Sequence, residues 1–145
     1  MTVSVDALKG DVAIAAKAAL TDLQNKGIPV AVASTLRTEA DQVALYHQGR
    51  CTLDLVNLSR HVAGMGPIAA AENTYTVTNC DGVNTLSNHQ GGRALDVVPT
   101  ENGKPVWPVP LDQRWIAISN VMKVHGFKWG GDWSSGFKDY PHYEM

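Results

Sequence analysis

The chain has 145 residues, of which 44% are hydrophobic and 18% charged, and its formal net charge is −2. This length and composition fit one globular domain with its own core. The small net charge and the scattered basic residues argue against a nucleic-acid partner, and no stretch of 18 apolar residues predicts a membrane span.

Apolar residues recur at three- and four-residue steps between Val5 and Lys26, which predicts an amphipathic helix ended by Gly27. Residues 28–33 are a β-branched run and predict a strand. A second helix is predicted from the N-cap Thr38 to Gly49. Residues 50–84 are rich in Gly, Asn and Thr, which predicts a long loop with a short strand at 74–78.

The second half of the chain adds strands and one more helix. Residues 93–98 alternate in polarity and predict a strand, followed by a turn at 103–104 and an extension of the sheet at 105–107. Residues 111–125 predict a third helix that ends at Gly126, and residues 143–145 a last strand. The pattern indicates an α+β fold, with about three helices packed on a small, mainly antiparallel sheet in a single domain.

Two imidazoles and one carboxylate stand in a pattern typical of a catalytic zinc site, which uses three protein ligands and keeps a fourth position open. His89 and Asp96 share the motif Ser87-Asn88-His89-Gln90-Gly91-Gly92-Arg93-Ala94-Leu95-Asp96, and His142 closes Asp139-Tyr140-Pro141-His142. A straight strand would separate His89 from Asp96 by more than about 20 Å. We therefore expect the two glycines between them to turn the chain back.

Asp139 and Arg37 are the candidates for catalysis. Pro141 disfavours a helix, so we expect Asp139 and His142 to lie across a turn, with Asp139 as general base for an activated water. Arg37 lies between the first predicted strand and the second helix, where a permanently charged donor can stabilise an oxyanion. His47, His61 and His125 are interpreted as surface or core residues. Cys51 and Cys80 lack zinc-site spacing and are either a disulfide or two free thiols.

These motifs resemble those of the zinc peptidases that cut peptidoglycan stem peptides, namely the D-Ala-D-Ala carboxypeptidases and the L-alanyl-D-glutamate endopeptidases, including phage endolysins. The family's S-x-H-x-x-G-x-A-x-D motif is matched from Ser87 to Asp96, and its acid-x-x-H motif by Asp139 and His142. The segment around Arg37 looks like the family's arginine-bearing helix. The matches extend from about Ala33 to Glu144.

The resemblance implies that one zinc ion is bound by His89, Asp96 and His142, and that Arg37 polarises the scissile carbonyl. An aspartate as the base, here Asp139, is typical of the endopeptidase branch, because the carboxypeptidases commonly have glutamate there. Four further residues are expected to contribute to substrate binding: Ser87, Gln42, Trp129 and Asp132.

The resulting hypothesis is a monomeric endolysin that hydrolyses the L-alanyl-D-glutamate bond of the stem peptide. We expect residues 1–145 to be one catalytic domain with no separate wall-binding domain. The N-terminus has no signal-peptide pattern, so we expect synthesis in the host cytoplasm and action on the cell wall, in the periplasm or outside. The alternatives are a D-alanyl-D-alanine carboxypeptidase and a non-catalytic, zinc-containing wall-binding protein. An Fe(II) oxygenase uses similar ligands, but its usual H-x-D spacing and all-β barrel do not fit this chain.

Overall fold

The computed structural model describes residues 1–134 and 137–145, and the chain divides into two compact units. The first, here called the helical unit, consists of Met1 and residues 37–91. The second, the sheet unit, consists of residues 2–36 and 92–145. No helix in the described part of the chain is long and apolar enough to cross a membrane.

The sheet unit contains an antiparallel sheet whose strands come from distant parts of the sequence. Its strands are β1 (Val30–Ser34), β2 (Ala94–Glu101), β3 (Lys104–Pro105), β4 (Lys128–Trp129) and β5 (His142–Glu144). Their order is β1-β2-β5-β4, and β3 pairs with β2. Asn102 and Gly103 both have positive φ, as a two-residue hairpin between β2 and β3 requires. The predicted α+β class is therefore confirmed.

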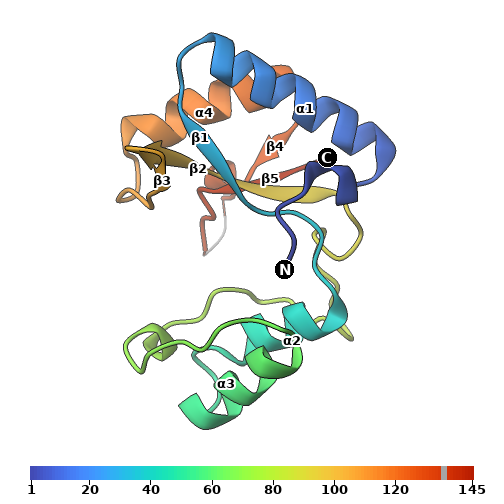
Figure 1. Ribbon diagram of the computed structural model, residues 1–145, viewed down its shortest axis with the longest axis vertical. Helices are drawn as coiled ribbons and strands as arrows, with labels where there is room; N and C mark the ends of the chain where they lie inside the picture. Colours follow the sequence, from blue (N-terminus) through green and yellow to red (C-terminus); the bar gives the residue numbers. More distant parts are fainter. Residues whose placement is uncertain (135–136) are drawn as a thin grey trace. The chain divides into compact units, whose positions relative to one another are not determined.

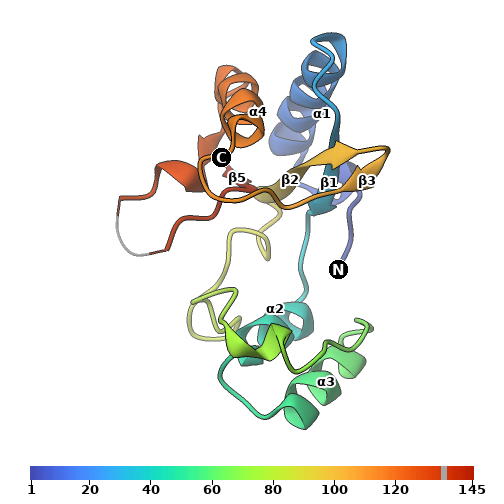
Figure 2. The same ribbon diagram turned by 90° about the vertical axis from the view of Figure 1, so that its left-hand side faces the viewer.

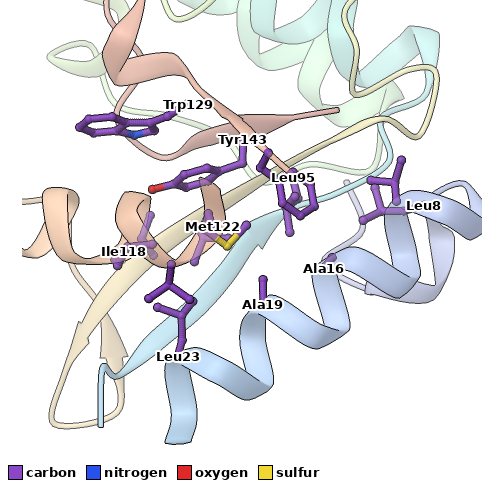
Figure 3. Packing of buried hydrophobic residues seen from close by; sticks show 14 of the residues in the cluster. Leu8, Ala16, Ala19, Leu23, Leu95, Ile118, Met122, Trp129 and Tyr143 are labelled. Carbon is purple, nitrogen blue, oxygen red and sulfur yellow. The ribbon is translucent and has the colours of Figure 1, made fainter. Parts of the chain in front are cut away.

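Two helices, α1 (Gly10–Asn25) and α4 (Gln113–Val124), pack against each other and against this sheet (Figures 1 and 2). A 3-10 turn, η1 (Val5–Ala7), occupies the first residues of the predicted helix. In both helices, buried residues recur at three- and four-residue spacing and form the face that packs on the sheet. Each fully buried large side chain contributes about 1.5–3 kcal/mol to stability. Figure 3 shows this core, which includes Ala16, Ala19, Leu23, Leu95, Ile118, Met122, Trp129 and Tyr143.

The helical unit contains α2 (Glu39–His47) and α3 (Leu53–Val62), which pack against each other. Thr38 caps α2 as predicted, because its side chain accepts a hydrogen bond from the backbone N–H of Asp41 and the Asp41 carboxylate accepts one from the N–H of Thr38. Helix α3 lies where a loop was predicted, so that prediction is wrong for these residues. Its signal was the N-cap Thr52 before an apolar run at helical spacing.

Two further details of the predicted fold are corrected. The predicted strand at 74–78 does not form: a 3-10 turn, η2 (Glu72–Thr74), comes first, and residues 75–78 are irregular. The chain has four α-helices among its described residues rather than three, and β4 precedes a third 3-10 turn, η3 (Gly130–Asp132). Cys51 and Cys80 are both free thiols.

Candidate metal centre

The pairing of β2 with β5 places Asp96 directly opposite His142. Leu95 and Tyr143, which are also partners, are fully buried in the core beneath α1 and α4. Because side chains alternate along a strand, Asp96 and His142 point to the other face of the sheet. The Nδ1 atom of His142 lies 3.6 Å from Oδ1 of Asp96. The sheet therefore brings a buried imidazole beside a carboxylate, and both residues are ones that the sequence predicts as ligands of one ion.

The imidazole of His142 lies between two carboxylates. Its Nε2 atom is 3.0 Å from Oε2 of Glu144, on the side of the ring away from Nδ1. Burial by itself lowers the pKa of His142, but hydrogen bonds to Asp96 and Glu144 and the charges of Asp96 and Asp139 outweigh it and raise this pKa above its ordinary value. A metal ion requires the neutral ring, so protons compete with a metal at this position.

A backbone turn holds Asp139 next to His142. The N–H of His142 donates to the carbonyl of Asp139 (3.2 Å), and the N–H of Asp139 donates to the carbonyl of Gly130 (3.1 Å). A Cβ atom on Gly130 would lie 3.1 Å from the Cβ atoms of both Asp139 and His142. The close approach of these two segments therefore needs glycine at position 130, and the predicted turn between Asp139 and His142 is found.

His89 is a buried residue of the helical unit, held in a turn three residues before the chain enters the sheet unit. Its N–H donates to Oγ of Ser87 (3.3 Å), and its carbonyl accepts from the N–H of Arg37 (3.1 Å). The Gln90 side chain accepts from the N–H of Ser87 (3.0 Å) and donates to the carbonyl of Gly82 (2.9 Å). Ser87 and Gln90 thus fix the backbone that carries His89.

One group of side chains in the described part of the chain has the spacing of a metal site. His89, Asp96 and His142 each offer a ligand atom, and these atoms all lie within 4.8 Å of one another. Two imidazole nitrogens and one carboxylate oxygen are ligands that Zn²⁺ accepts, and three protein ligands leave room for a water or a substrate. The donor set therefore fits a catalytic zinc ion.

Arg37 and Gln42 form a polar pair within the helical unit. Nη1 of Arg37 donates to Oε1 of Gln42 (3.3 Å), while Nε2 of Gln42 donates to Oγ1 of Thr78 and to the carbonyl of Cys80, both at 3.0 Å. Gln42 is 0% exposed. Its hydrogen bonds give it a structural role, which is to hold Arg37 and residues 78–80 in place.

The other predicted substrate-binding residues lie in different surroundings. Trp129 is 8% exposed, belongs to the core, and donates from Nε1 to the carbonyl of Tyr140 (2.7 Å). Asp132 is exposed and forms an ion pair with Lys123 (2.6 Å). Substrate binding by Ser87, Gln42, Trp129 and Asp132 stays a prediction.

Sequence reasoning assigned no role to Glu144, although its carboxylate contacts His142. A signal was available, because residues two apart on a strand share a face. With His142 predicted as a ligand and residues 143–145 expected as a strand, Glu144 falls beside the imidazole of His142.

Comparisons with known proteins agree with the motifs. Residues 81–145 match a family model described as D-alanyl-D-alanine carboxypeptidase. The chain is 31% identical over 128 residues to the peptidoglycan L-alanyl-D-glutamate endopeptidase CwlK of Bacillus subtilis, a match that covers 83% of this chain and 63% of that protein. It is 27% identical over 142 residues to the L-alanyl-D-glutamate peptidase of a Listeria phage, covering 98% of this chain and 39% of that protein. The chain thus spans less than two thirds of either relative.

Solved structures share the fold. The L-Ala D-Glu endopeptidase ChiX of Serratia marcescens has a TM-score of 0.58 at 21% identity, covering 97% of this chain and 82% of that one. The vancomycin-resistance D,D-pentapeptidase VanY, solved as a mutant with Zn(II), has a TM-score of 0.59 at 15% identity, covering 94% of this chain and 71% of that one. These matches confirm the predicted resemblance: the chain is similar to D-alanyl-D-alanine carboxypeptidases and to L-alanyl-D-glutamate endopeptidases.

Proposed function

We propose that this protein is a zinc-dependent peptidase that hydrolyses the L-alanyl-D-glutamate bond of the peptidoglycan stem peptide. The observation that carries the proposal is the group His89, Asp96 and His142, whose ligand atoms lie within 4.8 Å of one another. The similarity to CwlK and to the phage peptidase supports the choice of bond. The proposed site of action is the cell wall, and the proposed form is a monomer with one catalytic domain.

In this proposal Asp139 is the general base. A bound zinc ion would supply the positive charge that makes a water molecule acidic near neutral pH. The turn from Asp139 to His142 keeps the carboxylate close enough for its charge to raise the pKa of the His142 ring. Asp139 would take the proton of the attacking water and deliver it to the amine of the leaving D-glutamate.

Arg37 is proposed to polarise the scissile carbonyl. Its backbone N–H is tied to the carbonyl of His89 (3.1 Å), and its guanidinium is held by Gln42 (3.3 Å). A fixed guanidinium is always charged and can stabilise the developing oxyanion without reorganising. The hydrogen bond between Arg37 and His89 links this donor to a proposed metal ligand through one backbone contact.

A D-alanyl-D-alanine carboxypeptidase is the second candidate, because the matching family model carries that description. The two activities leave different products. An endopeptidase releases peptides with D-glutamate at a new amino terminus, whereas a carboxypeptidase removes only the terminal D-alanine.

The deciding experiment is mass spectrometry of purified peptidoglycan digested with zinc-loaded protein and, in parallel, with chelator-treated protein. We expect chelator-sensitive release of peptides with an amino-terminal D-glutamate. Loss of D-alanine alone would transfer the protein to the carboxypeptidase class. No chelator-sensitive product from several wall types would refute catalysis and favour a wall-binding protein.

Two variants separate the base from the metal site. Asp139→Ala is expected to bind zinc like the wild type and to lose hydrolysis by 100-fold or more, in the range of about 10²–10⁴ typical of general-base removal. Asp6→Ala is the matched control, because it removes an exposed carboxylate of the sheet unit that pairs only with Lys17 among the contacts described. Full activity of the Asp139 variant would show that another group is the base.

A further inference from the structure

The carboxylate of Glu144 lies next to the imidazole of His142, on the strand that carries both residues. Strand β5 alternates its side chains, so His142 and Glu144 share one face while Tyr143 between them points into the core. Oε2 of Glu144 lies 3.0 Å from Nε2 of His142. We propose that Glu144 is a positioning residue that orients His142 for metal binding. This inference rests on the zinc site proposed above.

The two ring nitrogens of His142 have different partners. Nδ1 faces Oδ1 of Asp96 at 3.6 Å, while Nε2 faces Glu144. A neutral imidazole has one N–H donor and one lone pair. Both carboxylates can only accept, so a protonated ring donates to each of them. In the neutral ring that a metal requires, the shorter contact to Glu144 holds the hydrogen on Nε2 and leaves the lone pair on Nδ1. That lone pair points toward Asp96, which is the other proposed ligand in the sheet unit.

The backbone around Glu144 is fixed on both sides. Its register partners are Ala94 on β2 and Lys128 on β4. The next residue, Met145, donates from its N–H to the carbonyl of Arg93 (3.1 Å) and accepts from Nε of Arg93 (2.7 Å). Glu144 side-chain exposure is 23%. A partly shielded carboxylate on an interior strand holds the ring orientation better than a mobile surface group could.

Mutation of a carboxylate that accepts a hydrogen bond from a metal-bound histidine typically lowers metal affinity about 10- to 100-fold. Glu144→Ala would free the ring to rotate and to exchange its hydrogen between the two nitrogens. Glu144→Gln keeps the shape and a neutral acceptor, but it lacks the charge that strengthens the bond. The alanine variant should therefore lose more affinity than the glutamine variant.

The test measures the zinc dissociation constant by competition with a chromophoric chelator, together with urea unfolding of the zinc-free proteins. We expect zinc affinity to fall about 10- to 100-fold in Glu144→Ala and several-fold in Glu144→Gln, with the stability of the zinc-free proteins unchanged. Glu101→Ala is the control, because Glu101 is a strand carboxylate whose partners are Lys104 in register and the Arg114 side chain. Its zinc affinity should equal that of the wild type.

Wild-type zinc affinity in Glu144→Ala would overturn the positioning role and leave the proposed function intact. If that variant does not fold, Glu144→Gln decides, and an affinity equal to the wild type then overturns the proposal. An equal loss of affinity in Glu101→Ala would also overturn it, since the effect would not be specific to His142. A wild-type protein that binds no zinc would refute both the inference and the proposed function.

Discussion

Replacing Gly130 with alanine should displace the proposed general base. The new Cβ would lie 3.1 Å from the Cβ atoms of Asp139 and His142 and would overlap the carbonyl oxygen of Asp139. Carbon atoms normally approach no closer than about 3.5–4.0 Å. The loop that carries Asp139 must therefore move away by roughly 0.5–1 Å, and the hydrogen bond from Asp139 to Gly130 must lengthen.

The cost can be worked from two opposing effects. Overpacking a tight contact costs about 1–3 kcal/mol, while replacing glycine with alanine restricts the unfolded chain and contributes about 0.4–1 kcal/mol of stability. The net loss of stability is therefore about 0–2.6 kcal/mol. A displacement near 1 Å at a catalytic group costs about 100-fold in rate. We expect activity to fall far more than stability does.

Gly10→Ala is the matched control, because a Cβ atom there has nothing within 4 Å and Gly10 begins α1. It should be neutral or stabilising by up to about 1 kcal/mol. The assay is urea unfolding followed by tryptophan fluorescence, combined with peptidoglycan hydrolysis. If Gly130→Ala matches Gly10→Ala in both stability and activity, the claim that position 130 needs glycine is refuted.

Three further changes test the surroundings of the site. The Tyr143 hydroxyl is buried without a hydrogen-bond partner in the described part of the chain. Tyr143→Phe should therefore raise the free energy of unfolding by about 1 kcal/mol in urea titrations. A decrease of that size would show that the hydroxyl has a partner. Gln42→Ala should lower the free energy of unfolding by about 1–3 kcal/mol or more, because it breaks buried hydrogen bonds. Unchanged stability with a raised KM would instead indicate that Gln42 binds the substrate directly. Asp81 accepts from the backbone N–H groups of Thr85, Val83 and Asn84, which lowers its pKa to about 2. Its stabilisation is therefore present above its ordinary pKa of 3.8 and lost as the pH falls toward 2. Asp81→Asn should be less stable than the wild type at pH 7 and equally stable near pH 2, as measured by urea unfolding at both pH values; a constant difference would contradict the assignment.

The helices of the sheet unit and the strand around Asp96 could be predicted because local patterns determine them. Helix α1 follows from apolar residues at helical spacing, and the strand around Asp96 from period-two alternation. Helix α3 was missed because the glycines and asparagines around it concealed a short amphipathic run, whose cap Thr52 was the remaining signal. Strand β4 has only two residues, Lys128 and Trp129, too few for any periodicity.

The group formed by His89, Asp96 and His142 could be predicted because spacing and resemblance act together, but the neighbours of these side chains could not. The contact between Gln42 and residues 78–80 joins segments more than 35 positions apart. Trp129 looks like a cleft residue in its glycine-rich motif, yet Gly131 makes room for its ring within the core. Such contacts depend on tertiary packing, which no local pattern encodes.

The position of β5 between β2 and β4 has a consequence for the newborn protein. The sheet cannot close until His142–Glu144, the last strand to be made, have left the ribosome. Asp96 precedes its partner His142 by 46 residues (142 − 96), which corresponds to about 2–9 s of synthesis at about 5–20 residues per second. Throughout that interval β2 lacks its partner β5, and the proposed metal group lacks His142. The proposed hydrolytic centre can therefore assemble only after His142 has been synthesised, later than His89 and Asp96.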